Sequence, residues 1–285
     1  MAFGKVVRAA KAATPLVGLI KEHFKSEEVH APLNLNSFLR CSALSSMCPR
    51  EEVLCVIHDV SRTMEVSVDL SLVFSLGNAL HNNLQNAVLP ALGDTLYGQW
   101  RCTSCGLLTG GPKDGKALLE YIIPRPKACA CGGTGFIYEE VSLRSEQYHL
   151  TGHPDGFLKI PEYDGFGILE AKSISERGAW EVKKTPKMDH VIQAQMYMWF
   201  TGTQWAQILY WDKGTFGING LIEHHVERDD DVLEGILESI DGLWSSIESY
   251  KSKGEKVLPE RICAAVDCPK AKTCAVATQC FSEPT

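Results

Sequence analysis

The stretch from Gly152 to Ser173 constrains the fold more than any other part of this sequence. It places two short apolar runs on either side of Asp164-Gly165, a dipeptide typical of a β-hairpin turn. We therefore expect two adjacent antiparallel strands. Alternation along the second strand divides its side chains between two faces: Ile168, Glu170 and Lys172 on one, Leu169 and Ala171 on the other.

Two carboxylates and one ammonium group are expected to meet on this hairpin. Asp155 precedes the turn and lies within reach of Glu170, and Lys172 shares the face of Glu170. Carboxylate oxygens are the ligands that Mg²⁺ and Mn²⁺ prefer, and a bound ion lowers the pKa of its water and neutralises charge on a phosphate. The pattern predicts metal-assisted hydrolysis of a phosphodiester. The alternative is a surface hairpin with an ordinary Glu–Lys strand pair.

Two segments with helical periodicity flank the hairpin in the sequence. Within residues 74–88, Gly77 and His81 lie four positions apart and share a helix face. The glycine would allow another element to approach closely, and His81 could offer its imidazole to a metal; the alternative is a partly exposed helical histidine. Residues 189–201 form the second helix, with Asp189 as N-cap and with Gln193 and Tyr197 on a common face.

In order, the motifs G-x-x-x-H, G-x-x-D-G, E-x-K and Q-x-x-x-Y resemble those of the PD-(D/E)XK nuclease superfamily, specifically its RecB-like branch. The resemblance covers residues 40–285 and implies an α/β fold, with a mixed central sheet flanked by helices. It implies that Lys172 handles the attacking water and that Gln193 and Tyr197 position the DNA strand. The metal ligands that it implies are His81, Asp155, Glu170 and the carbonyl of Ala171.

Composition and charge limit the possible functions. A hydrophobic content of 45% is that of a soluble globular protein, no apolar run is long enough to span a membrane, and the N-terminus lacks the features of a signal peptide. A net charge of −7 disfavours a broad basic surface for duplex DNA but allows a narrow channel. Eleven cysteines indicate metal sites in a reducing compartment, the cytoplasm, or the host cytoplasm if the chain is virus-encoded.

The first group of cysteines predicts a zinc ribbon. Cys102-x2-Cys105 and Cys129-x-Cys131 are each followed by glycine, as in zinc-knuckle turns, and four thiolates fit tetrahedral Zn²⁺. The second knuckle has one intervening residue where two are usual. The alternative, four cysteines without a metal, would leave exposed thiols that oxidise.

The second group lies at the C-terminus, at Cys263, Cys268, Cys274 and Cys280. Three of these thiols with an upstream cysteine would make a four-thiolate site. Iron–sulfur RecB-like nucleases hold a 4Fe-4S cluster with one N-terminal and three C-terminal cysteines, and this resemblance implies Cys48, Cys263, Cys274 and Cys280 as ligands. Spacing alone does not decide whether Cys263 or Cys268 is the ligand, or whether the site binds an iron–sulfur cluster or zinc. Cys41 and Cys55 are expected to be ordinary buried thiols.

Further elements complete the expected organisation. We expect an amphipathic helix over Val6–Phe24, a polar linker over 174–189, and strands at 206–212 and 216–224. A long amphipathic helix is expected over 229–250, with an inner face formed by Val232, Ile236, Ile240, Leu243 and Ile247. The predicted parts are an N-terminal helical part (1–97), a zinc-ribbon insertion (98–140), a nuclease core (141–228) and a C-terminal helix with an iron–sulfur clasp (229–285). The clasp would join Cys48 to the tail and restrict the unfolded chain.

The function predicted from these features is a Mg²⁺- or Mn²⁺-dependent deoxyribonuclease, an exonuclease acting on single strands or DNA ends in recombination, repair, phage or CRISPR DNA processing. The alternative is a non-catalytic nucleic-acid-binding or assembly subunit that keeps the nuclease fold. The expected partners are DNA, a second copy of the chain or a recombination protein, with no membrane association.

Overall fold

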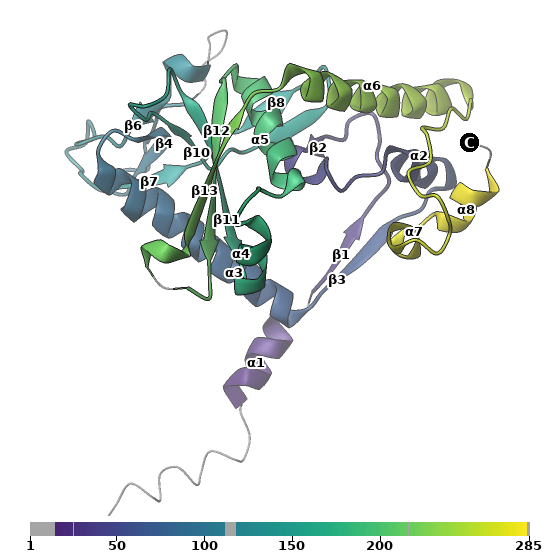
Figure 1. The fold of residues 1–285 in the computed structure, drawn as a ribbon, viewed down its shortest axis with the longest axis horizontal. Helices are drawn as coiled ribbons and strands as arrows, with labels where there is room; N and C mark the ends of the chain where they lie inside the picture. The colour runs from purple at the N-terminus through teal and green to yellow at the C-terminus, as the bar shows by residue number, and fades with distance from the viewer. Residues whose placement is uncertain (1–14, 25, 112–117, 216, 284–285) are drawn as a thin grey trace, which may run out of the picture.

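The computed structural model describes residues 15–24, 26–111, 118–215 and 217–283, which form a mixed α/β structure around one large sheet (Figure 1). Its spatial order is β13 (Leu221–Glu227), β12 (Trp205–Asp212), β11 (Gly167–Ile174), β10 (Gly156–Leu158), β4 (Leu96–Cys102) and β5 (Leu108–Thr109). β6 (Ile123–Pro124) and β7 (Phe136–Glu139) also pair with β4. β11 and β12 are parallel, and the other pairs are antiparallel.

The predicted hairpin is confirmed. β10 pairs antiparallel with β11 in a register that sets Gly156 opposite Leu169, and Gly165 in the turn has a φ of 69°. The predicted division of faces is also confirmed. Ile168 belongs to the core that contains Met196 and Ile208, whereas Leu169 and Ala171 belong to a second core on the opposite face. The sheet at β11 is therefore covered on both sides.

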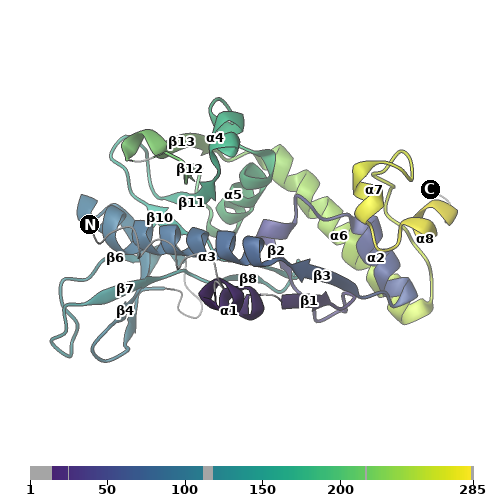
Figure 2. The same cartoon turned by 90° about the horizontal axis from the view of Figure 1, so that it is seen from below.

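Helices on the two faces bury these residues. α5 (Met188–Thr201) and α4 (Glu176–Val182) pack against β11 and β12, and α3 (Val68–Asn83) crosses the opposite face at β11 (Figure 2). The predicted polar linker over 174–189 is wrong in part, because Ser175 accepts a hydrogen bond from Gly178 N and caps α4. Asp189 lies in the first turn of α5, and the N-cap position falls on Lys187 instead.

The long C-terminal helix α6 (Asp230–Lys253) is capped by Asp229, which accepts from the N–H groups of Asp231 and Val232. Its buried face carries Leu233, Ile240, Leu243 and Ile247, and Val232 is 40% exposed. The expectation for Val232 is therefore wrong by one residue, because the core-facing stripe passes through Leu233. The strand expected at 216–224 begins later, at Leu221, after a short 3₁₀ turn.

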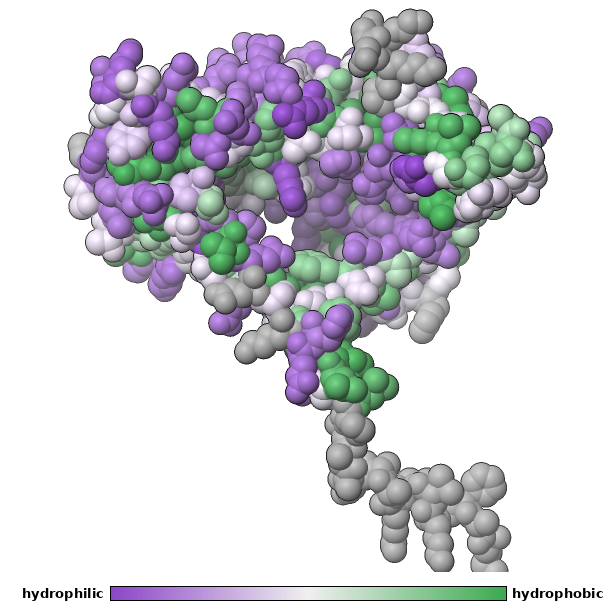
Figure 3. Space-filling model, turned by 180° about the vertical axis from the view of Figure 1, so that it is seen from behind, coloured by the Kyte–Doolittle hydropathy of each residue, from purple (hydrophilic) through white to green (hydrophobic). Residues whose placement is uncertain are grey.

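The N-terminal part contains a ribbon that the sequence did not indicate. β1 (Ser26–His30) pairs antiparallel with β3 (Arg62–Val66), and α1 (Pro15–His23) precedes it; the start of the helix expected over Val6–Phe24 falls outside the described residues. Figure 1 shows this ribbon running below the body of the molecule, and Figure 3 shows a hollow at the centre of the rear face, surrounded mainly by hydrophilic residues. A small sheet is formed by β2 (Leu39–Arg40), β9 (Leu150–Gly152) and β8 (Leu143–Ser145).

The C-terminal tail packs on α2 (Pro49–His58), away from the main sheet (Figure 1). Val276, the N-cap of α8 (Ala277–Ser282), and Cys280 of α8 share a small core with Leu54 and Cys55 of α2, and α7 (Pro269–Thr273) packs against α8. Arg50, which is 1% exposed, donates hydrogen bonds to the carbonyls of Pro259 and Glu283. The tail is therefore attached to a helix more than two hundred residues earlier in the chain.

Single-turn helices occupy Cys41–Ala43, Leu84–Val88, Leu89–Leu92, Leu118–Glu120 and Ile218–Gly220. Within the described ranges, every helix is too short or too polar to traverse a lipid bilayer.

Candidate active site and metal centres

Asp155 lies directly before β10 and is fixed to the neighbouring strand. Its Oδ2 accepts a hydrogen bond from the backbone N–H of Ala171 at 2.6 Å, and the residue is 7% exposed. A buried carboxylate that accepts from a backbone amide is held in one orientation without any metal. The structure thus brings Asp155 to the strand that carries Glu170 and Lys172.

His81 reaches the same place from α3. Its Nδ1 lies 3.1 Å from Oδ1 of Asp155, and this hydrogen bond is the main reason that the pKa of His81 is raised. Gly77, one turn earlier, faces β11: a Cβ there would lie 3.1 Å from Oγ of Ser173. The glycine therefore allows the close approach of helix and strand that was expected.

Glu170 is buried in the centre of the site. It is 1% exposed; its Oε1 lies 2.5 Å from Nζ of Lys172, and its Oε2 accepts no hydrogen bond from any residue in the described ranges. Burial, and then the charge of Asp155, raise the pKa of Glu170 to about 8. A buried carboxylate with an unpartnered oxygen is unfavourable unless a cation compensates it.

Lys172 is the only ammonium group within 4.0 Å of these carboxylates in the described part of the chain. Burial disfavours its charge, but Glu170 and Asp155 outweigh burial and raise the pKa of Lys172. Lys172 therefore stays protonated near neutral pH and can donate to a water or a phosphate oxygen.

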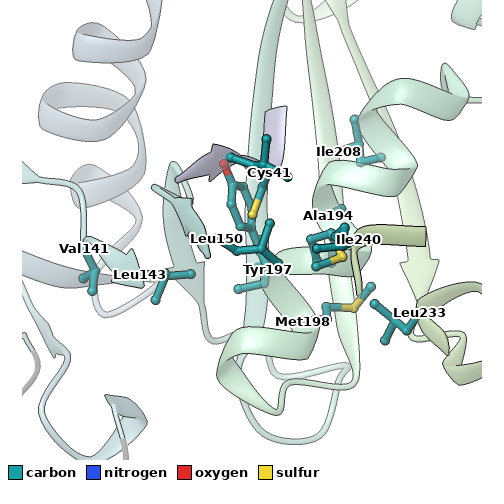
Figure 4. Packing of buried hydrophobic residues seen from close by; sticks show 14 of the residues in the cluster. Cys41, Val141, Leu143, Leu150, Ala194, Tyr197, Met198, Ile208, Leu233 and Ile240 are labelled. Atoms are coloured by element: carbon teal, nitrogen blue, oxygen red, sulfur yellow. The ribbon is translucent and has the colours of Figure 1, made fainter. Parts of the chain in front are cut away.

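Gln193 and Tyr197 face each other on α5. Gln193 Nε2 donates to the hydroxyl of Tyr197 at 2.9 Å, and burial raises the pKa of Tyr197 far above its usual range. The backbone of Gly152 lies against the Tyr197 ring, since a Cβ on this glycine would be 2.5 Å from Cε1. Figure 4 shows Tyr197 beside Cys41 and Leu150 in the core. The expectation that Cys41 and Cys55 are buried thiols is confirmed.

Glu140 and Gln85 join this site, and the sequence reading missed both. Nitrogen and oxygen atoms of His81, Glu140 and Asp155 lie within 4.8 Å of one another, an arrangement that could hold a metal ion. Gln85 Nε2 donates to both Glu140 Oε1, at 3.1 Å, and the Asp155 carbonyl, at 2.8 Å. Burial, and then Asp155, raise the pKa of Glu140. In the sequence Glu140 is one of two adjacent acids, Glu139 and Glu140, and no motif spacing marks it as a site residue.

The four cysteines of the first group converge. The Sγ atoms of Cys102 and Cys131 lie 3.7 Å apart, as do those of Cys105 and Cys129, and all four lie within 4.8 Å of one another. Gly106 and Gly132 have φ values of 75° and 85° and close the two knuckle turns. The single residue between Cys129 and Cys131 therefore does not prevent a group that could bind a metal.

Thiols of the tail line a small cavity between the tail and α2. Its lining includes Cys48, Cys263, Cys274 and Cys280, together with Lys270 and Phe281, but not Cys268. Cys268 instead caps α7, and its sulfur accepts from the N–H of Ala271 at 3.4 Å. The structure thus brings together the four tail-site cysteines expected from the sequence.

No family model matches the sequence, and no curated protein matches it. Among solved structures, an alkaline exonuclease (LHK-Exo) from Laribacter hongkongensis is similar, with a TM-score of 0.44 and 16% identity over 75% of this chain and 89% of that chain. The structure of SSO0001 has a TM-score of 0.41 and 13% identity, and the similarity covers 95% of this chain and 96% of that chain. A phage related exonuclease from Haemophilus somnus 129PT has a TM-score of 0.30 and 17% identity, and the similarity covers 40% of this chain and 60% of that chain. These similarities are distant and assign neither a family nor an activity.

Proposed function

We propose that this protein is a metal-dependent deoxyribonuclease that hydrolyses phosphodiester bonds. The observation that carries the proposal is the buried Glu170, whose Oε2 has no partner in the described residues, beside Asp155, His81 and the charged Lys172. Carboxylate and carbonyl oxygens suit Mg²⁺ or Mn²⁺, and the bound ion would supply a water of lowered pKa and neutralise phosphate charge.

The residues have separate roles in this proposal. His81, Asp155, Glu170 and the Ala171 carbonyl would hold the ion. Glu140 would join this ligand set, because the ligand atoms that lie within 4.8 Å of one another are those of His81, Glu140 and Asp155, without Glu170. Lys172 donates to the attacking water or to the scissile phosphate from its position 2.5 Å from Glu170. The Gln193–Tyr197 pair, held rigid by burial, positions the nucleic-acid strand.

We further propose exonucleolytic digestion of single strands or DNA ends. The net charge of −7 supports this choice, because a protein without a broad basic surface grips duplex DNA weakly. The resemblance of the four ordered motifs to RecB-like nucleases points to the same substrate class.

The two cysteine sites are proposed to be structural. Zn²⁺ at Cys102, Cys105, Cys129 and Cys131 would close the two knuckles. In the tail we assign the 4Fe-4S ligands to Cys48, Cys263, Cys274 and Cys280, because these thiols share one cavity while Cys268 caps a helix. The resemblance to iron–sulfur RecB-like nucleases is what favours a 4Fe-4S cluster over Zn²⁺ at this site.

The experiment is release of acid-soluble nucleotides from 5′- or 3′-labelled single-stranded and duplex DNA by anaerobically purified protein, with Mg²⁺, Mn²⁺ or chelator. We expect metal-dependent release that falls by about 10³-fold in Glu170→Gln. Glu234→Gln, an exposed acid on α6, is the matched control and should retain activity. The absence of release by folded, metal-loaded protein on every substrate would favour a non-catalytic nucleic-acid-binding subunit.

A further inference from the structure

A groove lies at the corner where the β10–β11 turn meets β12 and β13, away from the metal-binding carboxylates. It has a volume of about 540 Å³ and adjoins a hollow of about 360 Å³, and both are lined by Tyr163 and His225. On β11 and β12, Gln207 pairs with Leu169, whereas Lys172 pairs with Tyr210, three residues further along. The residues that line the groove and the hollow include none of the proposed active-site residues, so the groove is separate from the proposed active site.

Aromatic rings form one wall of the groove. The rings of Tyr163 and His225 stack with centroids 4.4 Å apart and planes 13° apart, and Trp205 lies 4.8 Å from Tyr163. Trp205 Nε1 donates to the Asp164 carbonyl at 2.9 Å, which fixes the wall to the turn. His225 is exposed and offers a planar surface to a ligand.

Carboxylates form the rim. Glu162, Asp164, Glu223 and Glu227 are exposed and line the groove or the hollow. None of them has an ion-pair partner within the described ranges, whereas Arg228, the one arginine or lysine in the lining, pairs with Asp230 at 2.7 Å. This charge distribution repels a phosphate backbone and attracts a cation.

Gln207 adds a buried acceptor to this groove. It is 4% exposed and lines the smaller hollow; its Nε2 lies 3.4 Å from Nδ1 of His225, and its Oε1 has no hydrogen-bond partner in the described part of the chain. A buried amide oxygen without a partner is costly, so a ligand that donates a hydrogen bond here would be stabilised.

We propose that this groove binds an arginine side chain presented by a partner protein. A guanidinium is planar, stacks on aromatic rings and carries five N–H donors, which match the ring wall, the free carboxylates and the amide of Gln207. A lysine ammonium has the same charge but neither the plane nor the fork of donors. The site is independent of the nuclease activity proposed above.

The test is isothermal titration of the full chain with hexaarginine, with hexalysine and with a single-stranded oligonucleotide, at low and moderate salt. We expect hexaarginine to bind more tightly than hexalysine. Because charge-assisted hydrogen bonds are lost, Glu223→Gln and Gln207→Leu should each weaken hexaarginine by about tenfold. The matched control is Glu238→Gln, an exposed acid on α6, which should lower the affinity for hexaarginine only by the small effect of one lost surface charge.

Several outcomes would overturn the proposal. Equal affinity for the two peptides, or equal losses in Glu223→Gln and Glu238→Gln, would mean general attraction to an acidic protein. Loss of oligonucleotide binding in Glu223→Gln would assign the groove to DNA. If Gln207→Leu lowers the melting temperature, its loss of binding could reflect unfolding, and the proposal is then tested by the affinity of Glu223→Gln alone. Nuclease activity measured on the same Glu223→Gln protein should be unchanged, which separates failure of this site from failure of the nuclease proposal.

Discussion

In the carboxylate centre the side chains are positioned by regular secondary structure, whereas in the cysteine-lined cavity of the tail they come from helix ends and irregular chain. Asp155 is fixed by a backbone amide of β11, and Glu170 lies within that strand. By contrast, Cys263 follows an irregular segment that begins at Gly254, and Cys48 and Cys274 flank helices.

This difference predicts which of the two sites needs a bound metal to keep its folded structure. Strands, helices and a backbone hydrogen bond hold the side chains of the carboxylate centre, so losing a ligand there should abolish chemistry and leave the fold. The tail is attached by a small core and by Arg50 and Arg261, which both donate to the carbonyl of Glu283 near the C-terminus. Losing a thiol there should loosen the fold, and the following predictions test this contrast from the largest effect to the smallest.

Lys172→Met should give the largest effect. Removing the ammonium group should lower the rate constant for DNA hydrolysis by about 10²- to 10³-fold, because its donor acts on the reacting water or phosphate. The melting temperature and Mn²⁺ affinity should change little. Lys184→Ala, in an exposed segment, is the control and should keep its rate. Equal rates for the two variants would remove Lys172 from the catalytic site.

Cys274→Ser should release the tail. We expect loss of iron and of visible absorption, and by analogy with removal of a long-loop cross-link a destabilisation of about 2–5 kcal/mol. Iron analysis, denaturant unfolding and limited proteolysis between Gly254 and the C-terminus measure this. Cys268→Ser should keep the iron; if it loses iron as Cys274→Ser does, the ligand assignment is wrong.

Glu170→Gln should be more stable than the wild type in chelator. Because the pKa of Glu170 is raised to about 8, the unfolded chain ionises this carboxyl above a pKa of about 4.5 whereas the folded chain resists ionising it. The amide removes this cost, so we expect a gain of about 1–3 kcal/mol in the free energy of unfolding at pH 7. Urea denaturation with chelator measures the gain, and added Mn²⁺ should reverse the order of stabilities. A loss of stability in chelator would contradict the view that this site is built around an ion.

The smallest effect should come from His190, whose titration should make the stability of the protein depend on pH. Its Nδ1 lies 2.8 Å from the Tyr210 hydroxyl, and burial, and then Lys172, lower its pKa to about 4. Because the unfolded chain binds this proton below a pKa of about 6.5 and the folded chain does not, stability should fall as the pH drops from about 6.5 toward about 4. His190→Gln should show a shallower fall in melting temperature over this range. Parallel curves for both proteins would exclude His190 as a source of the dependence.

The sequence predicted most of the centre because its residues follow local periodicities. Strand alternation placed Glu170 and Lys172 together, and the i,i+4 spacing paired Gln193 with Tyr197 and placed Gly77 where β11 approaches. Glu140 could not be found in this way, because only tertiary packing brings it to His81.

Other features also depended on tertiary structure. The β1–β3 ribbon joins segments more than thirty residues apart, and spacing did not show that Cys263, but not Cys268, lines the cavity with Cys48, Cys274 and Cys280. On α6 the periodicity correctly predicted Ile240, Leu243 and Ile247 as buried, and only the first position differs, where Leu233 is buried in place of Val232.

The most direct measurement is anomalous diffraction from crystals of the protein soaked in Mn²⁺. We predict an anomalous peak at about 2.1 Å from a carboxylate oxygen of Glu170 and in contact with His81 and Asp155. A peak held by Glu140 without Glu170, or no peak at this site, would contradict the claim that Glu170 is buried to hold the catalytic ion.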